Sequence, residues 1–387
     1  MATQTYRLEI LSPTHIGSGQ EHGAFDGVFQ NGRWYLIDLR KVLERSKEDP
    51  TNLANAMMQQ GFNWASWLQK RNISPAEVAA HSVACAQNPG ATKIRACIRD
   101  PFGRPYIPGS TLKGAIRTAV LESLLTGESR QRRQQWARRA VQKNQQGKPP
   151  DRRYVARNTL ERDLLIGKVS NRANESNYDL LRALHIGDSE PMYPEQAHIG
   201  LAWVHTLRNS QLVQKRAGGE EYKMFLEWLP TGVQTRLTIR IDERLLEGKY
   251  RQDVGFDDNQ VQALREFANA CNERARAVIE HEGEFYEDYG LPAIAKFYQM
   301  LDNQLQQIAK QRGFLLNIGW GGGWEMKTVT NPLTENLDEE YERIRQTYNL
   351  GRRGSDEFPK TRRVAYQGNQ PFAPPGWVAL VPEVKRP

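Results

Sequence analysis

Residues 104–119 read RPYIPGSTLKGAIRTA, an extended segment followed by the start of an amphipathic helix. The two prolines and Gly109 predict a turn, after which apolar residues recur at helical spacing. Ser110 is the expected N-cap, and Lys113 follows three residues later, where its charge opposes the helix dipole. An anion held by the free backbone N–H groups would reverse the sign of that interaction, and Arg117 could add a second positive charge on the same face.

This helix start allows two interpretations, a phosphate-binding site and an ordinary capped helix, because short motifs often occur by chance. Thr111 adds a second hydroxyl group to the phosphate interpretation. The stretch is not a Walker A motif, since Ala115 and Ile116 stand where Lys and Ser or Thr are required. Nucleotide hydrolysis of that type is therefore not expected.

A second candidate binding element is the glycine-rich stretch GWGGGW at residues 319–324. Gly321 and Gly322 allow a ligand to approach the backbone closely, and consecutive N–H groups can form an anion-binding nest. Trp324 could stack on a base, and Lys327 could contact a phosphate. Two tryptophans packed under a tight turn are the structural alternative. A dinucleotide-binding fingerprint is excluded, because Trp324 stands where its third glycine belongs.

Four stretches together resemble the RAMP superfamily, the repeat-associated proteins of type III CRISPR effector complexes. YIPGSTLKGAIRT at 106–118 resembles the superfamily signature, and SPTHIGSG at 12–19 is similar to its first strand and loop. GWGGGW resembles its C-terminal glycine-rich loop. FPKTRR at 358–363, followed by GWV at 376–378, is similar to the ending of one branch, the fifth subunit of the Csm (type III-A) complex.

The expected fold is α+β, because strands are separated by helices without regular βαβ spacing. The resemblance implies ferredoxin-like (RRM-like) sheets with helical and basic-loop insertions. We expect a RAMP domain over residues 1–230, with insertions at about 41–96 and 127–180. Residues 231–387 are expected to form a C-terminal α+β region that carries the glycine-rich loop.

Local patterns predict individual elements of this fold. Alternation at Tyr6, Leu8 and Ile10 predicts a first strand, and Asn31-Gly32 predicts a type I′ hairpin. Residues 41–96 look helical and polar, with a capping box that begins at Ser74. Further strands are expected near 181–189, 199–205, 223–229, 237–241 and 314–318, and amphipathic helices over 257–281 and 294–308.

Residues 127–157 are the most basic part of the chain, with ten Lys or Arg and two acidic residues. Such an imbalance of sign is not typical of a mixed solvating surface. We therefore expect this segment to contact the RNA backbone, although a solvated charged surface is the alternative. Its candidate contacts are Arg132, Arg133, Arg138 and Arg139.

The composition favours a protein that binds a polyanion. The 387 residues carry a formal net charge of +8, and the isoelectric point is near 9.3. No apolar run approaches the roughly 20 residues of a membrane helix, and the start of the chain does not resemble a signal peptide. Three cysteines without a C-x-x-C pair suggest reduced thiols, so the expected compartment is cytoplasmic.

Catalytic candidates are few. His15, His22 and Asp26 lie near the first loop, but their spacing fits no standard metal site, and no cofactor is expected. In the resembling backbone subunits an aspartate in a comparable loop cleaves target RNA, which makes Asp26 one alternative. His15 as general acid/base in processing precursor RNA is the other. A turn aspartate is the preferred interpretation of Asp26, and His15 and Ser18 are expected to contact RNA.

The resemblance implies a non-catalytic RNA-binding subunit of a type III-A complex. Such a subunit would cap the end that holds the 3′ part of the guide crRNA and would aid its maturation. Its expected partners are crRNA, target RNA, a neighbouring backbone RAMP subunit and a small helical subunit. Host nucleases that trim the crRNA are further candidate partners, and no membrane is expected.

Overall fold

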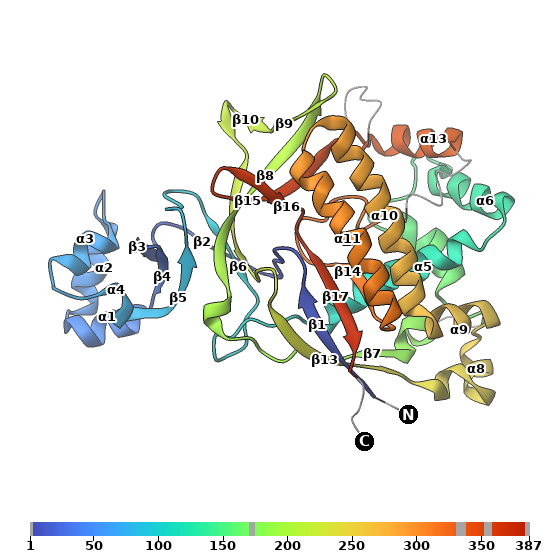
Figure 1. The fold of residues 1–387 in the computed structure, drawn as a ribbon, viewed down its shortest axis with the longest axis horizontal. Helices are drawn as coiled ribbons and strands as arrows, with labels where there is room; N and C mark the ends of the chain where they lie inside the picture. Colours follow the sequence, from blue (N-terminus) through green and yellow to red (C-terminus); the bar gives the residue numbers. More distant parts are fainter. Residues whose placement is uncertain (1–2, 170–174, 330–337, 352–357, 384–387) are drawn as a thin grey trace.

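A sheet of five antiparallel strands brings the two ends of the chain together (Figure 1). The computed structural model describes residues 3–169, 175–329, 338–351 and 358–383. In sheet order the strands are β14 (Phe314–Asn317), β17 (Trp377–Pro382), β1 (Gln4–Ile10), β13 (Gln234–Ile241) and β7 (Leu184–Ile186). Because β1 pairs with β13 and β17, the sheet takes strands from both sides of residue 230. The predicted domain division there stays a prediction.

Helices pack on both faces of this sheet at the β14–β17 edge. Phe314 and Val378 belong to the core under α5 and α9, whereas Leu315 and Trp377, one residue along, pack under α11. This alternation follows from the pleat of the strands. The helices are α5 (Gly109–Thr126), α9 (Asp258–Arg265), α10 (Phe267–Tyr289) and α11 (Pro292–Lys310). The predicted single helix at 257–281 is wrong, since the backbone leaves helical geometry at Glu266.

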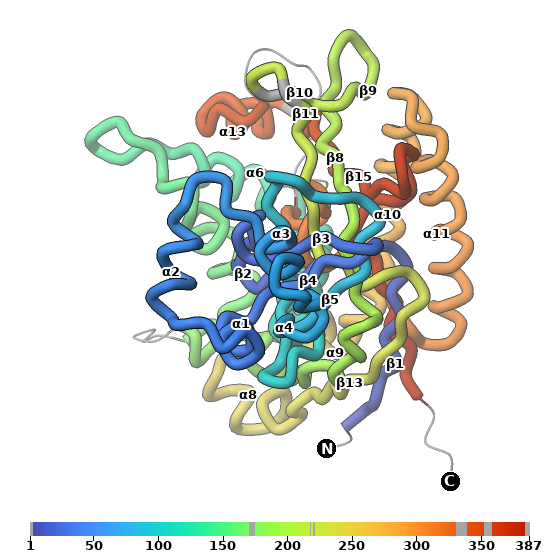
Figure 2. Tube along the Cα trace, turned by 90° about the vertical axis from the view of Figure 1, so that its left-hand side faces the viewer, coloured from blue at the N-terminus to red at the C-terminus, as the bar shows by residue number. Residues whose placement is uncertain are grey.

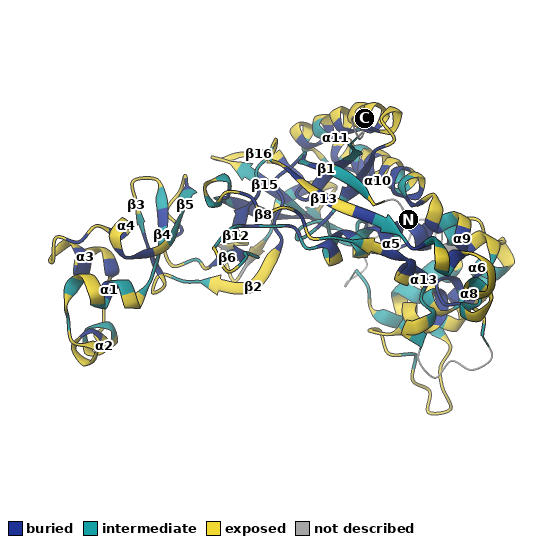
Figure 3. Ribbon diagram, turned by 90° about the horizontal axis from the view of Figure 1, so that it is seen from below, coloured by how far each residue is buried: buried dark blue, intermediate teal, exposed yellow. Residues whose placement is uncertain are grey.

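A second, ten-stranded sheet runs from the centre of the molecule to the N-terminal lobe (Figures 1 and 3). Its strand order is β2-β6-β12-β8-β5-β4-β3, and β8 also pairs with β15 and β9. The strands are β2 (Gly17–His22), β6 (Ile94–Cys97), β12 (Lys223–Trp228), β8 (His198–Arg208), β5 (Ala79–Cys85), β4 (Arg33–Ile37), β3 (Gly27–Gln30), β15 (Thr361–Gln367), β16 (Gln370–Ala373) and β9 (Gln211–Gln214). The strands are mostly antiparallel, with parallel pairs only at β6–β12 and β5–β8 among the described strands, and together with the packed helices they confirm the α+β class.

The N-terminal lobe packs four short helices against β3, β4 and β5, and Figure 2 shows the helices in front of these strands. They are α1 (Leu39–Ser46), α2 (Pro50–Met58), α3 (Trp64–Gln69) and α4 (Pro75–Val78). The capping box at Ser74 and the hairpin at Asn31-Gly32 are confirmed. The prediction of helix up to residue 96 is wrong, because residues 79–97 contain β5 and β6. Pairing with β4 and β8 overrides the weak strand preference of these Ala-rich residues.

Shorter elements complete the described chain. The basic segment forms α6 (Arg130–Val141), which packs beside α13 (Asp338–Tyr348). The others are α7 (Arg162–Leu164), α8 (Gly248–Val254), β10 (Arg216–Ala217) and β11 (Glu220–Glu221). The three cysteines are free and buried, as predicted. Within the described residues, no helix is long and apolar enough to cross a membrane.

Candidate nucleic-acid interface

Three loops that are distant in sequence meet beside the five-stranded sheet. The Trp320 N–H donates to the His15 carbonyl at 2.9 Å, and the Gly376 N–H donates to the Pro13 carbonyl at 3.0 Å. Gly319 has φ of +73°, and a Cβ atom there would lie 2.3 Å from the His15 carbonyl oxygen. Only glycine therefore fits at this close approach. The first loop and the glycine-rich loop, predicted separately from sequence, form one structural unit.

The indole ring of Trp320 carries two arginines. The guanidinium carbon of Arg95 lies 5.8 Å from the ring centre, and that of Arg363 lies 5.5 Å from it. Arg95 comes from β6 and Arg363 from β15, two strands of the ten-stranded sheet. The rings of Trp228 and Trp320 pack edge-to-face, with their centres 6.1 Å apart. The two arginine distances fit cation–π contacts, which hold the guanidinium groups beside the glycine-rich loop.

Positive charge is in excess around this ring. The pKa of Arg363 is lowered by desolvation and by repulsion from Arg95, and the pKa of Lys327 is lowered by desolvation and by Arg363. Glu21 lies 3.5 Å from the Arg95 Nε. Among the described residues, no carboxylate lies within ion-pair distance of Arg363 or Lys327. Cations gathered without matching carboxylates can attract an anion such as a phosphate.

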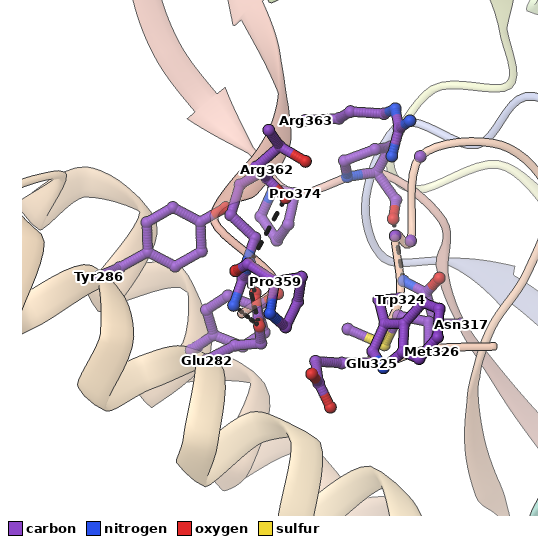
Figure 4. A pocket seen from close by; sticks show the side chains of 16 residues that line it. Glu282, Tyr286, Asn317, Trp324, Glu325, Met326, Pro359, Arg362, Arg363 and Pro374 are labelled. Carbon is purple, nitrogen blue, oxygen red and sulfur yellow. Dashed lines mark hydrogen bonds and ion pairs between the residues drawn. The ribbon is translucent and has the colours of Figure 1, made fainter. Parts of the chain in front are cut away.

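A buried ion pair fixes the direction of Arg363. The neighbouring Arg362 points into the protein, where its Nε lies 2.9 and 2.8 Å from the two carboxylate oxygens of Glu282 on α10. Its guanidinium also lies 3.9 Å from the ring centre of Phe285. Successive side chains of a strand point to opposite faces, so this anchor turns Arg363 outward (Figure 4). The pocket beside the pair holds about 20 Å³, room for about one water molecule and too little for a base.

Three predicted residues of the glycine-rich loop, Gly321, Gly322 and Trp324, line this pocket, and Lys327 does not. Trp324 packs edge-to-face on Phe358, with ring centres 5.0 Å apart, and is half-buried. A Cβ on Gly321 would lie 2.2 Å from a ring carbon of Pro375, and one on Gly322 would lie 2.4 Å from the Asn317 side-chain oxygen. These glycines therefore serve close packing, and Trp320, not the predicted Trp324, is the tryptophan whose ring contacts Arg95 and Arg363.

The side chain of His15 is enclosed by the protein. It is 2% exposed, and its Nδ1 lies 2.8 Å from the Glu227 carbonyl oxygen. Burial lowers the pKa of this imidazole, which favours the neutral form. A ring enclosed in this way cannot reach an RNA backbone. Ser18 differs, because it lies on the exposed strand β2, where its hydroxyl donates to the Ala96 carbonyl at 3.2 Å.

A buried carboxylate that the sequence did not reveal lies beside His15. Glu227 is 1% exposed and accepts a hydrogen bond from the Cys97 N–H at 2.9 Å. Arg99 and His81 approach its two oxygens at 3.3 and 3.7 Å. Burial opposes ionisation of Glu227, but His81, Arg99 and the Cys97 N–H together lower its pKa. Since β5 carries His81 and β12 carries Glu227, this cluster connects the N-terminal lobe to the centre of the molecule.

The signature helix α5 starts differently from the prediction. Pro108 is the N-cap and Ser110 lies inside the first turn, so the predicted cap is wrong. The Gly109 N–H donates to the Asp188 carboxylate at 2.8 Å. A carboxylate of the protein thus occupies a place where a phosphate was expected, because β7 ends in a turn beside the helix.

The two cations of this helix have different environments. Arg117 is paired with Asp179 at 2.7 Å and with Glu161 at 2.8 Å, so its charge is matched. Lys113 is half-buried, and its pKa is lowered by desolvation and by Arg117, while Asp179 opposes this change. Thr111 is half-buried on the same turn. Lys113 is therefore the stronger phosphate candidate of the two cations.

The arginines of α6 also have carboxylate partners. Arg132 pairs with Glu128 at 2.7 Å, Arg139 with Asp163 at 2.6 Å, and Arg138 approaches Glu340 at 3.9 Å. Arg133 has an interaction partner as well. Asp163 and Glu340 lie outside residues 127–157, which explains why this segment looks unbalanced in the sequence. RNA contact by these four arginines stays a prediction.

The remaining catalytic candidates do not form a recognisable site. The Asp26 carboxylate accepts a hydrogen bond from the Gly23 N–H at 2.6 Å, which closes the turn before β3. His22 ends the exposed strand β2. Among the described residues, no group of three or more His, Cys, Asp or Glu side chains is placed to hold a metal ion. The turn interpretation of Asp26 thus has a direct structural basis.

Comparison with protein families gives one extended match. A sequence model described as the RAMP superfamily matches residues 7–325. A protein named "CRISPR system Cms protein Csm5" from Methanocaldococcus jannaschii is 23% identical over 98% of this chain and 88% of its own length. A protein of the same name from Streptococcus thermophilus is 27% identical over 31% of this chain and 39% of its own length.

Two solved structures have a similar fold. One is a chain of a cryo-EM structure described as a Csm-crRNA-target RNA ternary complex of a type III-A CRISPR-Cas system, with a TM-score of 0.71 and 24% identity. The alignment covers 99% of this chain and all of that chain. The other is the crystal structure of T. onnurineus Csm5, with a TM-score of 0.67, 20% identity, and coverage of 96% and 99%.

Proposed function

The chain belongs to the RAMP superfamily, and from this premise we propose that it is an RNA-binding subunit of a type III-A CRISPR (Csm) effector complex. Two kinds of likeness support the assignment. A relative that aligns over nearly the whole chain is named Csm5, and a chain of similar fold comes from a Csm complex with crRNA and target RNA. In this role the ligand is the guide crRNA, with target RNA paired to it.

The observation that carries the proposal is the excess of positive charge around Trp320. Besides desolvation, Arg95 lowers the pKa of Arg363, and Arg363 lowers the pKa of Lys327, yet Arg363 and Lys327 have no carboxylate partner among the described residues. An RNA phosphate would remove this repulsion. Among the predicted contacts, Lys113 and the exposed Ser18 are further candidates for RNA contact.

The subunit binds and positions RNA and does not cut it. His15 is enclosed, and the carboxylate of Asp26 closes a turn, so neither is placed for acid/base work on a substrate. In the complex the subunit caps the end that holds the 3′ part of the crRNA, beside a backbone RAMP subunit and a small helical subunit. Host nucleases that trim the crRNA would then act at this end.

The test is crRNA binding by the purified protein over a range of salt concentrations. Arg363→Gln and Lys327→Gln together remove two unmatched cations, so the slope of log K against log salt should fall by about 1.4, at about 0.7 per single-strand phosphate contact. The matched control is Lys296→Gln with Arg312→Gln, which removes the same charge from exposed positions at α11. Equal effects of both pairs would show only a general charge effect and contradict this site.

A further inference from the structure

Between β6 and α5 the chain makes a tight hairpin over residues 99–105, closed by a bridge between Arg99 and Pro105. The Asp100 carboxylate accepts hydrogen bonds from the Phe102 N–H at 3.0 Å, the Arg104 N–H at 2.9 Å and the Arg104 Nε at 2.8 Å. Arg99 donates to the Gly103 carbonyl at 2.7 Å. These bonds cross the hairpin in both directions and fix its tip in one conformation.

The tip presents a single large apolar side chain to solvent. Phe102 is 80% exposed, and the Arg104 guanidinium lies 5.2 Å from the centre of its ring. An exposed phenylalanine contributes little to folding, since its apolar surface stays in water. A rigid loop that holds such a side chain has already lost the conformational entropy that binding would otherwise cost. The hairpin therefore has the properties of a preorganised anchor for a partner.

The charges around the hairpin distinguish it from the Trp320 site. Arg104 pairs with Asp100 at 2.7 Å, and Arg99 with the buried Glu227 at 3.3 Å, so both arginines are matched. RNA affinity comes largely from cations at phosphates, and the hairpin has no surplus cation to offer. Its shape and charge suit a protein surface better than an RNA backbone.

The segment beside the hairpin extends this surface. The Met192 N–H donates to the Pro105 carbonyl at 2.8 Å, which holds residues 188–195 along the base of the hairpin. This segment contains three acidic residues and no Lys or Arg, and its Tyr193 is 75% exposed. Acidic groups repel phosphates and attract basic side chains. The partner that fits is an apolar pocket with a basic rim.

We propose that Phe102 anchors a protein–protein contact, in which its ring enters an apolar pocket with a basic rim on a neighbouring protein subunit of the effector complex. The contact rests on the proposed function, because that function supplies the neighbouring subunit. Arg104 lies over the ring at the edge of the contact, and aromatic and arginine side chains are the commonest binding hot spots.

The experiment measures the affinity of the purified protein for the complex reconstituted from the other subunits and crRNA. Phe102→Ala should weaken association by about tenfold or more, as expected for a hot-spot residue. Phe102→Leu keeps apolar bulk and should lose less. The matched control is Met58→Ala, since Met58 is 83% exposed on α2 in the N-terminal lobe. Direct crRNA affinity and thermal stability of each variant are measured in parallel, and neither should change.

Each outcome decides the proposal. Association of Phe102→Ala equal to that of the wild type overturns it, and so does an equal loss with Met58→Ala. Weaker crRNA binding by Phe102→Ala with normal association also overturns it, because the ring would then stack on a base. Failure of the wild-type protein to join the complex would instead overturn the proposed function, so the two failures are distinguishable.

Discussion

The ion pair between Glu282 and Arg362 allows a sharp prediction about stability. The two side chains are only 4% and 7% exposed, and the Arg362 Nη2 lies 2.8 Å from the Glu282 Oε1. With an effective dielectric constant of about 20, a charge pair at this distance attracts by about 6 kcal/mol, most of which offsets the cost of burying both charges. Glu282→Gln leaves the arginine charge buried and unmatched. We expect the free energy of unfolding to fall by about 3–5 kcal/mol.

Chemical denaturation of the purified protein measures this loss, and two controls give it meaning. Glu340→Gln removes one partner of the long pair with Arg138, 3.9 Å, in which the side chains of Arg138 and Glu340 are 67% and 13% exposed, and should cost less than about 1 kcal/mol. The double variant Glu282→Leu with Arg362→Met removes both charges and should recover much of the loss, because neither member of the pair then remains without the other. A loss below about 1 kcal/mol for Glu282→Gln alone would refute the reasoning.

Three further predictions follow from single contacts. Arg117→Met should lower the free energy of unfolding more than the free energy of crRNA binding, because Glu161 and Asp179 lose their shared partner. Chemical denaturation and a crRNA-binding assay measure the two effects. Burial lowers the pKa of His205 to about 4 from an ordinary 6.5, so its contribution to stability is present above pH 6.5 and is lost as the pH falls toward 4. His205→Gln should make the free energy of unfolding, measured by denaturation at several pH values between 4 and 6.5, less dependent on pH. Asp26→Ala should leave single-turnover cleavage of target RNA by the assembled complex within a few-fold, whereas a catalytic group typically contributes about 10²-fold or more.

Local sequence patterns predicted the elements that are determined by residues close together in the chain. The turn before α5 follows from its prolines and glycine, the hairpin at Asn31-Gly32 from residues that tolerate positive φ, and β13 from strict alternation. The pattern failed at residues 79–97, where pairing with other strands determines the structure. It also placed the cap of α5 on Ser110, because Asp188, which binds the first N–H, lies 79 residues away in the chain.

The Trp320 site depends on contacts between distant parts of the chain, so sequence reasoning identified only part of it. Lys327 follows the glycine-rich loop directly, but Arg95 and Arg363 reach the indole from strands that are far away in sequence. One signal was present in TRRVAYQ at residues 361–367, because strand pleating puts Arg362 on the same face as the apolar Val364. An arginine at an inward position, Arg362, indicates a buried partner, and the next residue must then point outward.

Charge matching separates the cations that hold the fold together from those available to a ligand. Arg117, Arg132 and Arg139 looked like RNA contacts in the sequence, yet each has a carboxylate partner at 2.6–2.8 Å. RNA could compete for them only by displacing that partner, which would cost part of the energy gained. Arg363 and Lys327 pay no such cost, since their surroundings already repel a further positive charge. We therefore expect the unmatched charge of Arg363 and Lys327 to contribute most to RNA binding, and the most basic stretch of the sequence to be a weaker guide to the RNA contacts.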